Sequence, residues 1–183
     1  GIPENRIKKM GKEDNFWGPT GLEGPCGPTT EIHFLLSEKL EEGVEVWNLV
    51  FNEYYKERSG RLIPLKQKGV DTGMGLERLA MVVQNKKSVF ETDLFLPIIE
   101  QLRKEGNQLK NTVAERIISD HIKGAVFLIS EGILPSNVER GYVLRRILRR
   151  AIRYGKLINL KKNFLISLAK KVIEIYKEIY PEV

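Results

Sequence analysis

Apolar and polar residues alternate with a two-residue period in part of the first half of the chain. Between Val44 and Tyr55 this alternation is typical of a β-strand, and it places Asn48 and Val50 on the same face. A turn at Arg58–Gly60 and a second short strand at Arg61–Leu65 complete a predicted hairpin. The pattern predicts antiparallel sheet in this half.

Most of the remaining chain follows the helical period. Thr112 and Glu115 have the spacing of a capping box, which predicts the start of a helix. The predicted helices are Leu76–Gln84, Leu94–Lys104, Thr112 to about Gly132, Gly141–Gly155 and Asn163–Tyr180. We therefore predict an α+β fold with two domains, a sheet-containing one in residues 1–94 and an all-helical one in residues 95–183.

The segment Pro19–Pro28 has neither period and is rich in glycine and proline, so we predict a loop. Glu31 follows it, and is expected either near a magnesium ion or amine or simply beside a rigid surface turn. Trp17 precedes the loop, and we expect it either to be a core residue or to form an apolar wall for a small ligand. We expect Cys26 to be packed and inert, and His33 and His121 to be structural.

The composition is that of a globular domain and excludes several classes of protein. The 183 residues are 42% hydrophobic and 30% charged, with no apolar run long enough to span a bilayer and no apolar signal segment at the start. The one cysteine cannot form an internal disulfide, and with two histidines it argues against a structural zinc site. We expect a cytoplasmic protein that does not bind membranes and has no metal site in this chain.

Charge is distributed unevenly between the two predicted domains. Residues 1–94 carry 13 Lys and Arg against 15 Asp and Glu, whereas residues 95–183 carry 17 against 9. A positive excess of this size indicates that the helical domain faces a polyanion.

The segment Gly69–Arg78 is a candidate phosphate site. It combines Asp71, two glycines at positions 73 and 75, and an arginine in the first turn of the predicted helix. Glycines at a helix start allow backbone N–H groups to approach an anion, and Arg78 adds further donors. The pattern lacks the residues of a P-loop and the third glycine of a Rossmann fingerprint. It is also compatible with a simple turn and helix cap.

A second candidate site is the arginine-rich helix. At roughly 100° per residue, its five arginines fall within an arc of about 140°. They are Arg145, Arg146, Arg149, Arg150 and Arg153. No acidic residue is interleaved with them, so contact with nucleic-acid phosphates is favoured over ion pairs with a neighbouring domain.

Asn137 lies in the loop Leu134–Asn137, just before the arginine-rich helix. An amide side chain donates and accepts at once, which suits recognition of a base edge. The alternative is a turn residue or a helix cap.

Several ordered motifs resemble those of the alanyl-tRNA synthetases along nearly the whole chain. They are Asp14–Trp17, Gly24–Pro28 with Glu31–Ile32, Trp47–Phe51, Val70–Arg78, Ser119–Ile122, Leu134–Asn137 and Arg140–Arg150. The resemblance implies an internal fragment of a class II synthetase, with part of the antiparallel catalytic sheet followed by a tRNA-recognition domain. Such an enzyme activates alanine with ATP and transfers it to the 3′ end of tRNA(Ala).

The resemblance also implies residue roles. Arg78 is the catalytic residue and binds the ATP phosphates together with Gly73 and Gly75. Alanine is bound by Trp17, Asn48, Val50, Asp71 and Gly73. The acceptor stem of tRNA is bound by Asn137, at its guanine–uracil wobble pair, and by Arg145, Arg146, Arg149, Arg150 and Arg153.

The same resemblance implies ATP and Mg²⁺ as cofactors. Zinc is expected only in an editing domain outside this chain, and self-association only through other absent domains. Two class motifs lie upstream in the family, so we expect the fragment alone to be inactive. The alternative is a non-catalytic RNA-binding module derived from such an enzyme.

Overall fold

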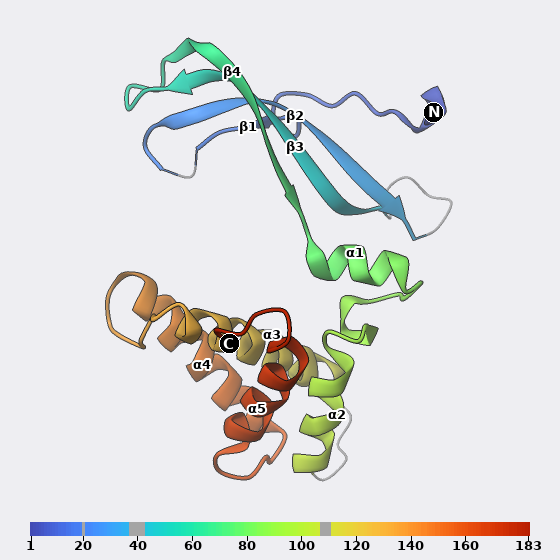
Figure 1. The fold of residues 1–183 in the computed structure, drawn as a ribbon, viewed down its shortest axis with the longest axis vertical. Helices are drawn as coiled ribbons and strands as arrows, with labels where there is room; N and C mark the ends of the chain where they lie inside the picture. Colours follow the sequence, from blue (N-terminus) through green and yellow to red (C-terminus); the bar gives the residue numbers. More distant parts are fainter. Residues whose placement is uncertain (20, 37–42, 107–110) are drawn as a thin grey trace. The chain divides into compact units, whose positions relative to one another are not determined.

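The computed structural model describes residues 1–19, 21–36, 43–106 and 111–183 and consists of two compact units. The first unit comprises Gly1–Lys87 and the second comprises Ser88–Val183 (Figure 1). The assignment of residues 1–94 to a catalytic domain and of residues 95–183 to a tRNA-recognition domain stays a prediction.

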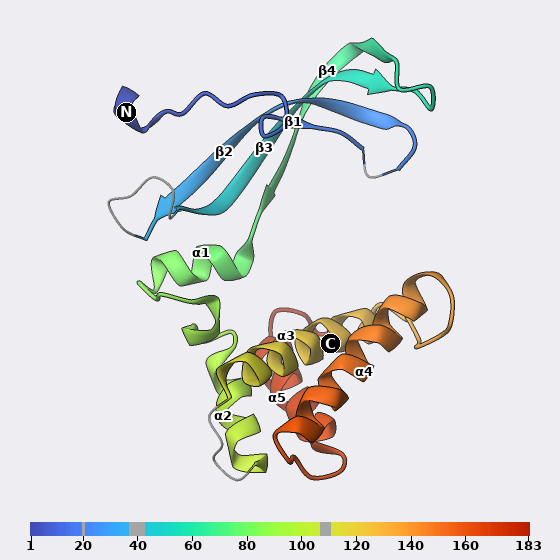
Figure 2. The same cartoon turned by 180° about the vertical axis from the view of Figure 1, so that it is seen from behind.

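The first unit is built on a four-stranded antiparallel sheet in which the strands follow one another in sequence order (Figures 1 and 2). A short 3₁₀ helix, η1, precedes the sheet, and one α-helix follows it. The elements are η1 (Glu4–Arg6), β1 (Phe16–Trp17), β2 (Gly24–Leu35), β3 (Gly43–Lys56), β4 (Leu62–Met74) and α1 (Leu76–Val83). The predicted strand Val44–Tyr55 and the predicted helix from Leu76 are confirmed.

Strand β4 is longer than predicted. The second predicted strand ended at Leu65, and a strand end at Asp71 followed by a turn at Gly73 and Gly75 was expected, but β4 runs without interruption to Met74. Gly69 pairs with Asn52 and Gly73 pairs with Asn48, so β3 holds the glycine-containing segment extended. Ladder pairing with a long neighbouring strand therefore overrides the local preference of glycine for turns.

The prediction of a loop over Pro19–Pro28 is wrong for Gly24–Pro28, which forms the first part of β2; Thr20 lies outside the described residues. The glycine at position 27 has a packing role. A Cβ there would lie 1.7 Å from the carbonyl oxygen of Phe51 on β3, at a register shift between the two strands. Glycine thus marks a close approach of two backbones. Cys26 beside it is fully buried, as expected.

The second unit is helical, and its predicted helices are confirmed with small shifts of their ends. Helix α5 packs against α2 and α3, and α4 packs against α3. The elements are η3 (Val89–Glu91), α2 (Leu96–Glu105), α3 (Thr112–Ser130), α4 (Glu139–Leu157) and α5 (Phe164–Tyr176). The α+β prediction is confirmed. Across the part of the chain that the structure describes, no helix has the length and apolar character needed to cross a membrane.

A single apolar core holds these helices together. It contains buried side chains from α2, α3 and α5, from the residue just before α2 and from the residue just after α4. They are Phe95, Ile98, Leu102, Ala114, Ile118, Ile122, Ile158, Phe164, Leu168, Val172 and Tyr176. Gly155 on α4 lets α5 approach, because a Cβ there would lie 2.4 Å from the Phe164 ring.

The start of α3 differs from the predicted capping box. Asn111, not Thr112, is the N-cap, and its Oδ1 accepts a hydrogen bond from the Ala114 N–H at 3.1 Å. Glu115 is buried, at 2% exposure, and accepts two hydrogen bonds from Arg103 of α2, at 2.9 Å and 2.8 Å. These bonds raise the pKa of Arg103 above its usual value. The carboxylate therefore ties two helices together instead of capping one.

We predict that Arg103→Ala destabilises the helical unit by about 1–2 kcal/mol, because it leaves the buried Glu115 carboxylate without its donors. The measurement is urea unfolding of the chain followed by circular dichroism at 222 nm. Lys104→Ala is the matched control, since Lys104 is an exposed neighbour on the same helix. Equal unfolding midpoints for the two variants would contradict this role.

Candidate active site and nucleic-acid interface

Four of the five residues expected to bind alanine lie side by side on two neighbouring strands. Asn48 of β3 pairs with Gly73 of β4, and Val50 pairs with Asp71. Residues two apart on a strand share a face, so these side chains project on the same side of the sheet. The pairing register therefore brings together a set that the sequence places more than twenty positions apart.

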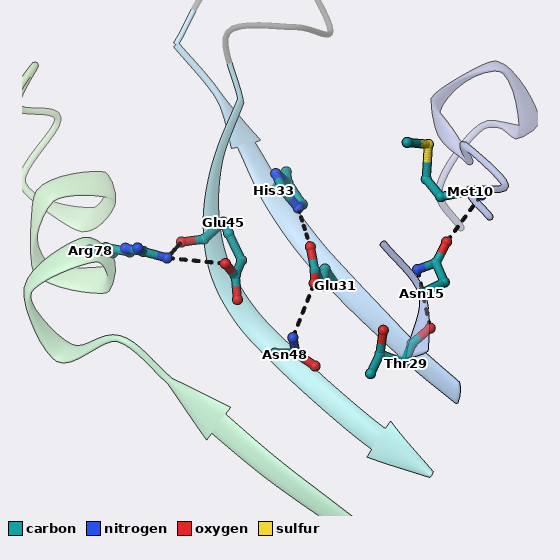
Figure 3. Close-up of polar contacts among 8 residues, drawn as sticks. All are labelled: Met10, Asn15, Thr29, Glu31, His33, Glu45, Asn48 and Arg78. Atoms are coloured by element: carbon teal, nitrogen blue, oxygen red, sulfur yellow. Dashed lines mark hydrogen bonds and ion pairs between the residues drawn. The ribbon is translucent and has the colours of Figure 1, made fainter. Parts of the chain in front are cut away.

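Glu31 of β2 extends this polar group to a third strand (Figure 3). Asn48 Nδ2 donates to Glu31 Oε1 at 3.1 Å, and the other Glu31 oxygen lies 2.9 Å from His33 Nε2. An ionised carboxylate only accepts hydrogen bonds, so it orients the Asn48 amide nitrogen towards β2. Asn48 Oδ1 is buried and has no hydrogen-bond partner among the described residues. The site thus contains a buried acceptor that no described residue satisfies.

Asp71 supplies negative charge beside this acceptor. Its Oδ1 accepts the backbone N–H of Thr72 at 2.9 Å, while the residue is exposed. Among the residues that the structure describes, the Asp71 carboxylate forms no ion pair. It is available to a cationic group of a ligand.

Trp17, the fifth residue of the predicted alanine site, lies apart from the other four in the ladder. It belongs to β1, opposite Gly27, and is 40% exposed. Within the described residues, no hydrogen bond or ring contact joins it to Asn48 or Asp71. Its role in an alanine site stays a prediction.

The two glycines of the candidate phosphate site do not form the predicted turn. Gly73 lies within β4, and only Gly75 stands at the start of α1. The Gly75 N–H donates to the Val46 carbonyl at 3.0 Å, so it is not free for an anion. The donors that remain are the first N–H groups of α1 and the guanidinium of Arg78.

Arg78 reaches from α1 to the beginning of β3 (Figure 3). Its Nη1 donates to the Glu45 carbonyl at 2.9 Å and to Glu45 Oε2 at 3.3 Å, and half of the side chain remains exposed. A Cβ on Gly75 would lie 3.3–3.4 Å from three carbons of the Arg78 stem, so glycine leaves room for that stem. Sequence analysis missed Glu45, which alternation alone makes an ordinary strand residue.

The described residues contain no group of three or more His, Cys, Asp or Glu side chains that fits a metal ion. Mg²⁺ is commonly held by one or two carboxylates together with substrate phosphates and water. The remaining ligands of such an ion come from the substrate phosphates and water, so this chain need supply only one or two carboxylates.

The arginine-rich face of α4 is fully open. All five predicted arginines are exposed, and within the described residues of this unit none of them forms an ion pair. Arg150 lies over the Tyr154 ring at 5.9 Å. Five uncompensated like charges on one helix face repel one another, which favours an anionic partner.

Asn137 lies in the loop immediately before α4. The N-cap of α4 is Val138, without a side-chain cap, so Asn137 is not the cap. Ser136 N donates to the Gly141 carbonyl at 3.0 Å, and a Cβ on Gly141 would lie 2.3 Å from Ser136 Oγ and 2.5 Å from the Leu134 carbonyl oxygen. Glycine therefore lets the loop fold back on the helix, which leaves Asn137 exposed.

We predict that Gly141→Ala displaces this loop and destabilises the helical unit by about 1–3 kcal/mol, because the added methyl overlaps backbone. Gly124→Ala is the matched control. It adds the same methyl within α3, where the nearest atom, on Ile147, is 4.0 Å away. Thermal unfolding and NMR shifts of residues 134–138 are the measurements, and unchanged shifts in Gly141→Ala would contradict the packing role.

Comparison with known proteins gives consistent results over the full chain. The family model "tRNA synthetases class II (A)" matches residues 1–183. The chain is 44% identical to the alanine–tRNA ligase of Dehalococcoides mccartyi, over 100% of its own length, and 48% identical to that of Thermotoga maritima, also over 100%. In both cases it spans 23% of the relative's length.

Proposed function

The chain belongs to the class II (A) tRNA synthetases, and we propose that the protein containing it attaches alanine to tRNA(Ala) in the cytoplasm. The names of the relatives support the choice of alanine. Synthetases of this class use ATP and Mg²⁺. The alanine carboxylate attacks the α-phosphate of ATP and pyrophosphate leaves. A hydroxyl of the tRNA 3′ end then attacks the alanine carbonyl carbon, and AMP leaves.

The cluster on β3 and β4 is the observation that carries this proposal. Alanine has one ammonium group and one methyl group to recognise. The exposed Asp71 carboxylate suits the ammonium group, and Asn48 Oδ1, which is buried and has no partner among the described residues, is a second acceptor in the same cluster. Val50 supplies apolar surface next to Asp71. A Cβ on Gly73 would meet nothing within 4 Å, so there is open space beside Asn48.

Arg78 supports the activation step. Negative charge moves onto the departing pyrophosphate when the carboxylate attacks, and a guanidinium held in place stabilises that charge. Arg78 is half-exposed and stands in the first turn of α1, where the helix dipole also favours an anion. We assign the phosphate contact to Arg78 and to the N-terminal end of α1.

The second unit supports the choice of a structured RNA as substrate. The α4 arginines suit the phosphate backbone of the acceptor stem, while Asn137 suits one base pair in its minor groove. Phosphate contacts contribute affinity but do not distinguish one sequence from another. Asn137 is therefore the residue that discriminates between base pairs. This division of roles follows from the different chemistry of the two groups.

Removal of the Asp71 charge tests the alanine site. We predict that Asp71→Asn in the complete protein raises the KM for alanine by about tenfold or more, because an amide replaces a charge-assisted contact with the ammonium group. The KM for ATP should not change. Alanine-dependent ATP–pyrophosphate exchange is the measurement. Asp14→Asn, which alters another exposed aspartate of the unit, is the control.

An unchanged KM for alanine in Asp71→Asn would remove this residue from the site. If the unmodified complete protein binds tRNA(Ala) but shows no alanine-dependent exchange, the ligase proposal is wrong and a non-catalytic RNA-binding module is favoured.

Two substitutions separate the roles proposed for the tRNA interface. Asn137→Ala should reduce discrimination between wobble and Watson–Crick acceptor stems by about tenfold. Arg149→Ala should weaken binding to every stem and lower the slope of log Kd against log salt by about 1. Binding of the complete protein to matched stems, measured across a salt series, is the experiment. Arg58→Ala, in the other unit, is the control.

Equal effects of Asn137→Ala on both stems, or an unchanged salt slope in Arg149→Ala, would contradict the corresponding assignment.

A further inference from the structure

Strand β3 has a bulge next to the start of α1. Ile32 of β2 pairs with Trp47, but the next residue, His33, pairs with Glu45, so Val46 is an extra residue on β3. The carbonyl of Val46 accepts the N–H of Gly75, the N-cap of α1, at 3.0 Å. A bulge commonly changes the direction of a side chain near a functional site. Here it both fixes the helix start and turns Glu45 towards that helix.

The contacts of Glu45 with Arg78 are arranged to leave one edge of the guanidinium free. Both hydrogen bonds from Arg78, to the carbonyl at 2.9 Å and to the carboxylate at 3.3 Å, come from the same nitrogen, Nη1. Guanidinium has five N–H donors in a planar fork. The Nε and Nη2 groups form no hydrogen bond or ion pair with the described residues. That remaining edge has the geometry for two parallel bonds to a phosphate.

We propose that Glu45 is a positioning residue, which holds Arg78 by Nη1 so that the Nε–Nη2 edge binds the ATP phosphates. The inference rests on the proposed function of Arg78 and adds a residue that does not itself touch ATP. Its backbone and side chain act together: the carbonyl orients one nitrogen, and the carboxylate limits rotation of the guanidinium plane. The space that Gly75 leaves for the aliphatic part of the Arg78 side chain contributes to the same positioning of the guanidinium.

The matched control lies on the same strand. Glu53 of β3 accepts a hydrogen bond from Lys68 of β4 at 3.2 Å, with similar exposure to Glu45, 33% against 36%. Substitution of Glu53 also removes an ion pair made by a glutamate of β3, but one that joins two strands and does not involve Arg78. Any general effect of loss of an ion pair on β3 therefore appears in both variants.

The experiment measures dissociation constants of ATP and adenosine for the complete protein. Glu45→Ala is expected to weaken ATP binding about fivefold, the range for a half-exposed ion pair, and to leave adenosine binding unchanged because adenosine has no phosphates. Glu45→Gln should have a smaller effect, because its amide oxygen still accepts from Nη1. Glu53→Ala should change neither constant.

A double substitution tests whether Glu45 acts through Arg78. In the Arg78→Ala background, Glu45→Ala should add no further loss of ATP affinity. The proposal is overturned by additive effects, by equal weakening of ATP and adenosine, by unchanged or tighter ATP binding in Glu45→Ala, or by a larger effect of Glu45→Gln than of Glu45→Ala.

Failure of this inference is distinguishable from failure of the proposed function. The binding measurements need neither alanine nor tRNA. If the unmodified protein binds ATP but does not catalyse alanine-dependent exchange, the ligase proposal fails while the Glu45 variants still test the positioning role. If exchange is normal and Glu45→Ala binds ATP as the unmodified protein does, only the positioning role fails.

Discussion

The hydrogen-bonded pairing of β3 with β2 and β4 is the constraint on which the candidate active site depends. The ladder aligns Glu31 with Asn48 and Asn48 with Gly73, and it sets Val50 opposite Asp71. A slip of one residue would turn each of these side chains to the other face of the sheet. The candidate site of the first unit therefore depends on the pairing register of these strands. That register is fixed because β3 is long and pairs with β2 on one side and with β4 on the other.

At three glycines of the candidate sites and their supports, the absence of a side chain lets two segments come close. At Gly27 the backbone of β3 occupies the place of a Cβ, and at Gly141 the preceding loop does so. At Gly75 the room is filled by the stem of Arg78. In each case glycine is needed for close packing and not for backbone flexibility, because the neighbouring atoms belong to the candidate sites or to the segments that hold them.

The two units differ in how they treat charge. In the first unit, Glu31 and Glu45 each contact a residue of the candidate site, and these contacts orient an amide and a guanidinium. In the second unit, the buried Glu115 is matched by Arg103, whereas the five arginines on the exposed face of α4 form no ion pair with the described residues of that unit. The paired charges hold side chains in fixed positions. The five arginines of α4, which form no such pairs, are suited to attract a polyanion.

Hydrophobic periodicity by itself determined the helices, the β3 strand, the α+β class and the basic face of α4, since these depend on local spacing along the chain. Only the tertiary structure decided that Gly24–Pro28 is a strand, that β4 continues through Gly73, and that Glu115 ties α3 to α2. It also decided that Glu45 meets Arg78. Each of these depends on contacts between segments distant in sequence, where ladder pairing, close backbone approach and burial outweigh local propensity.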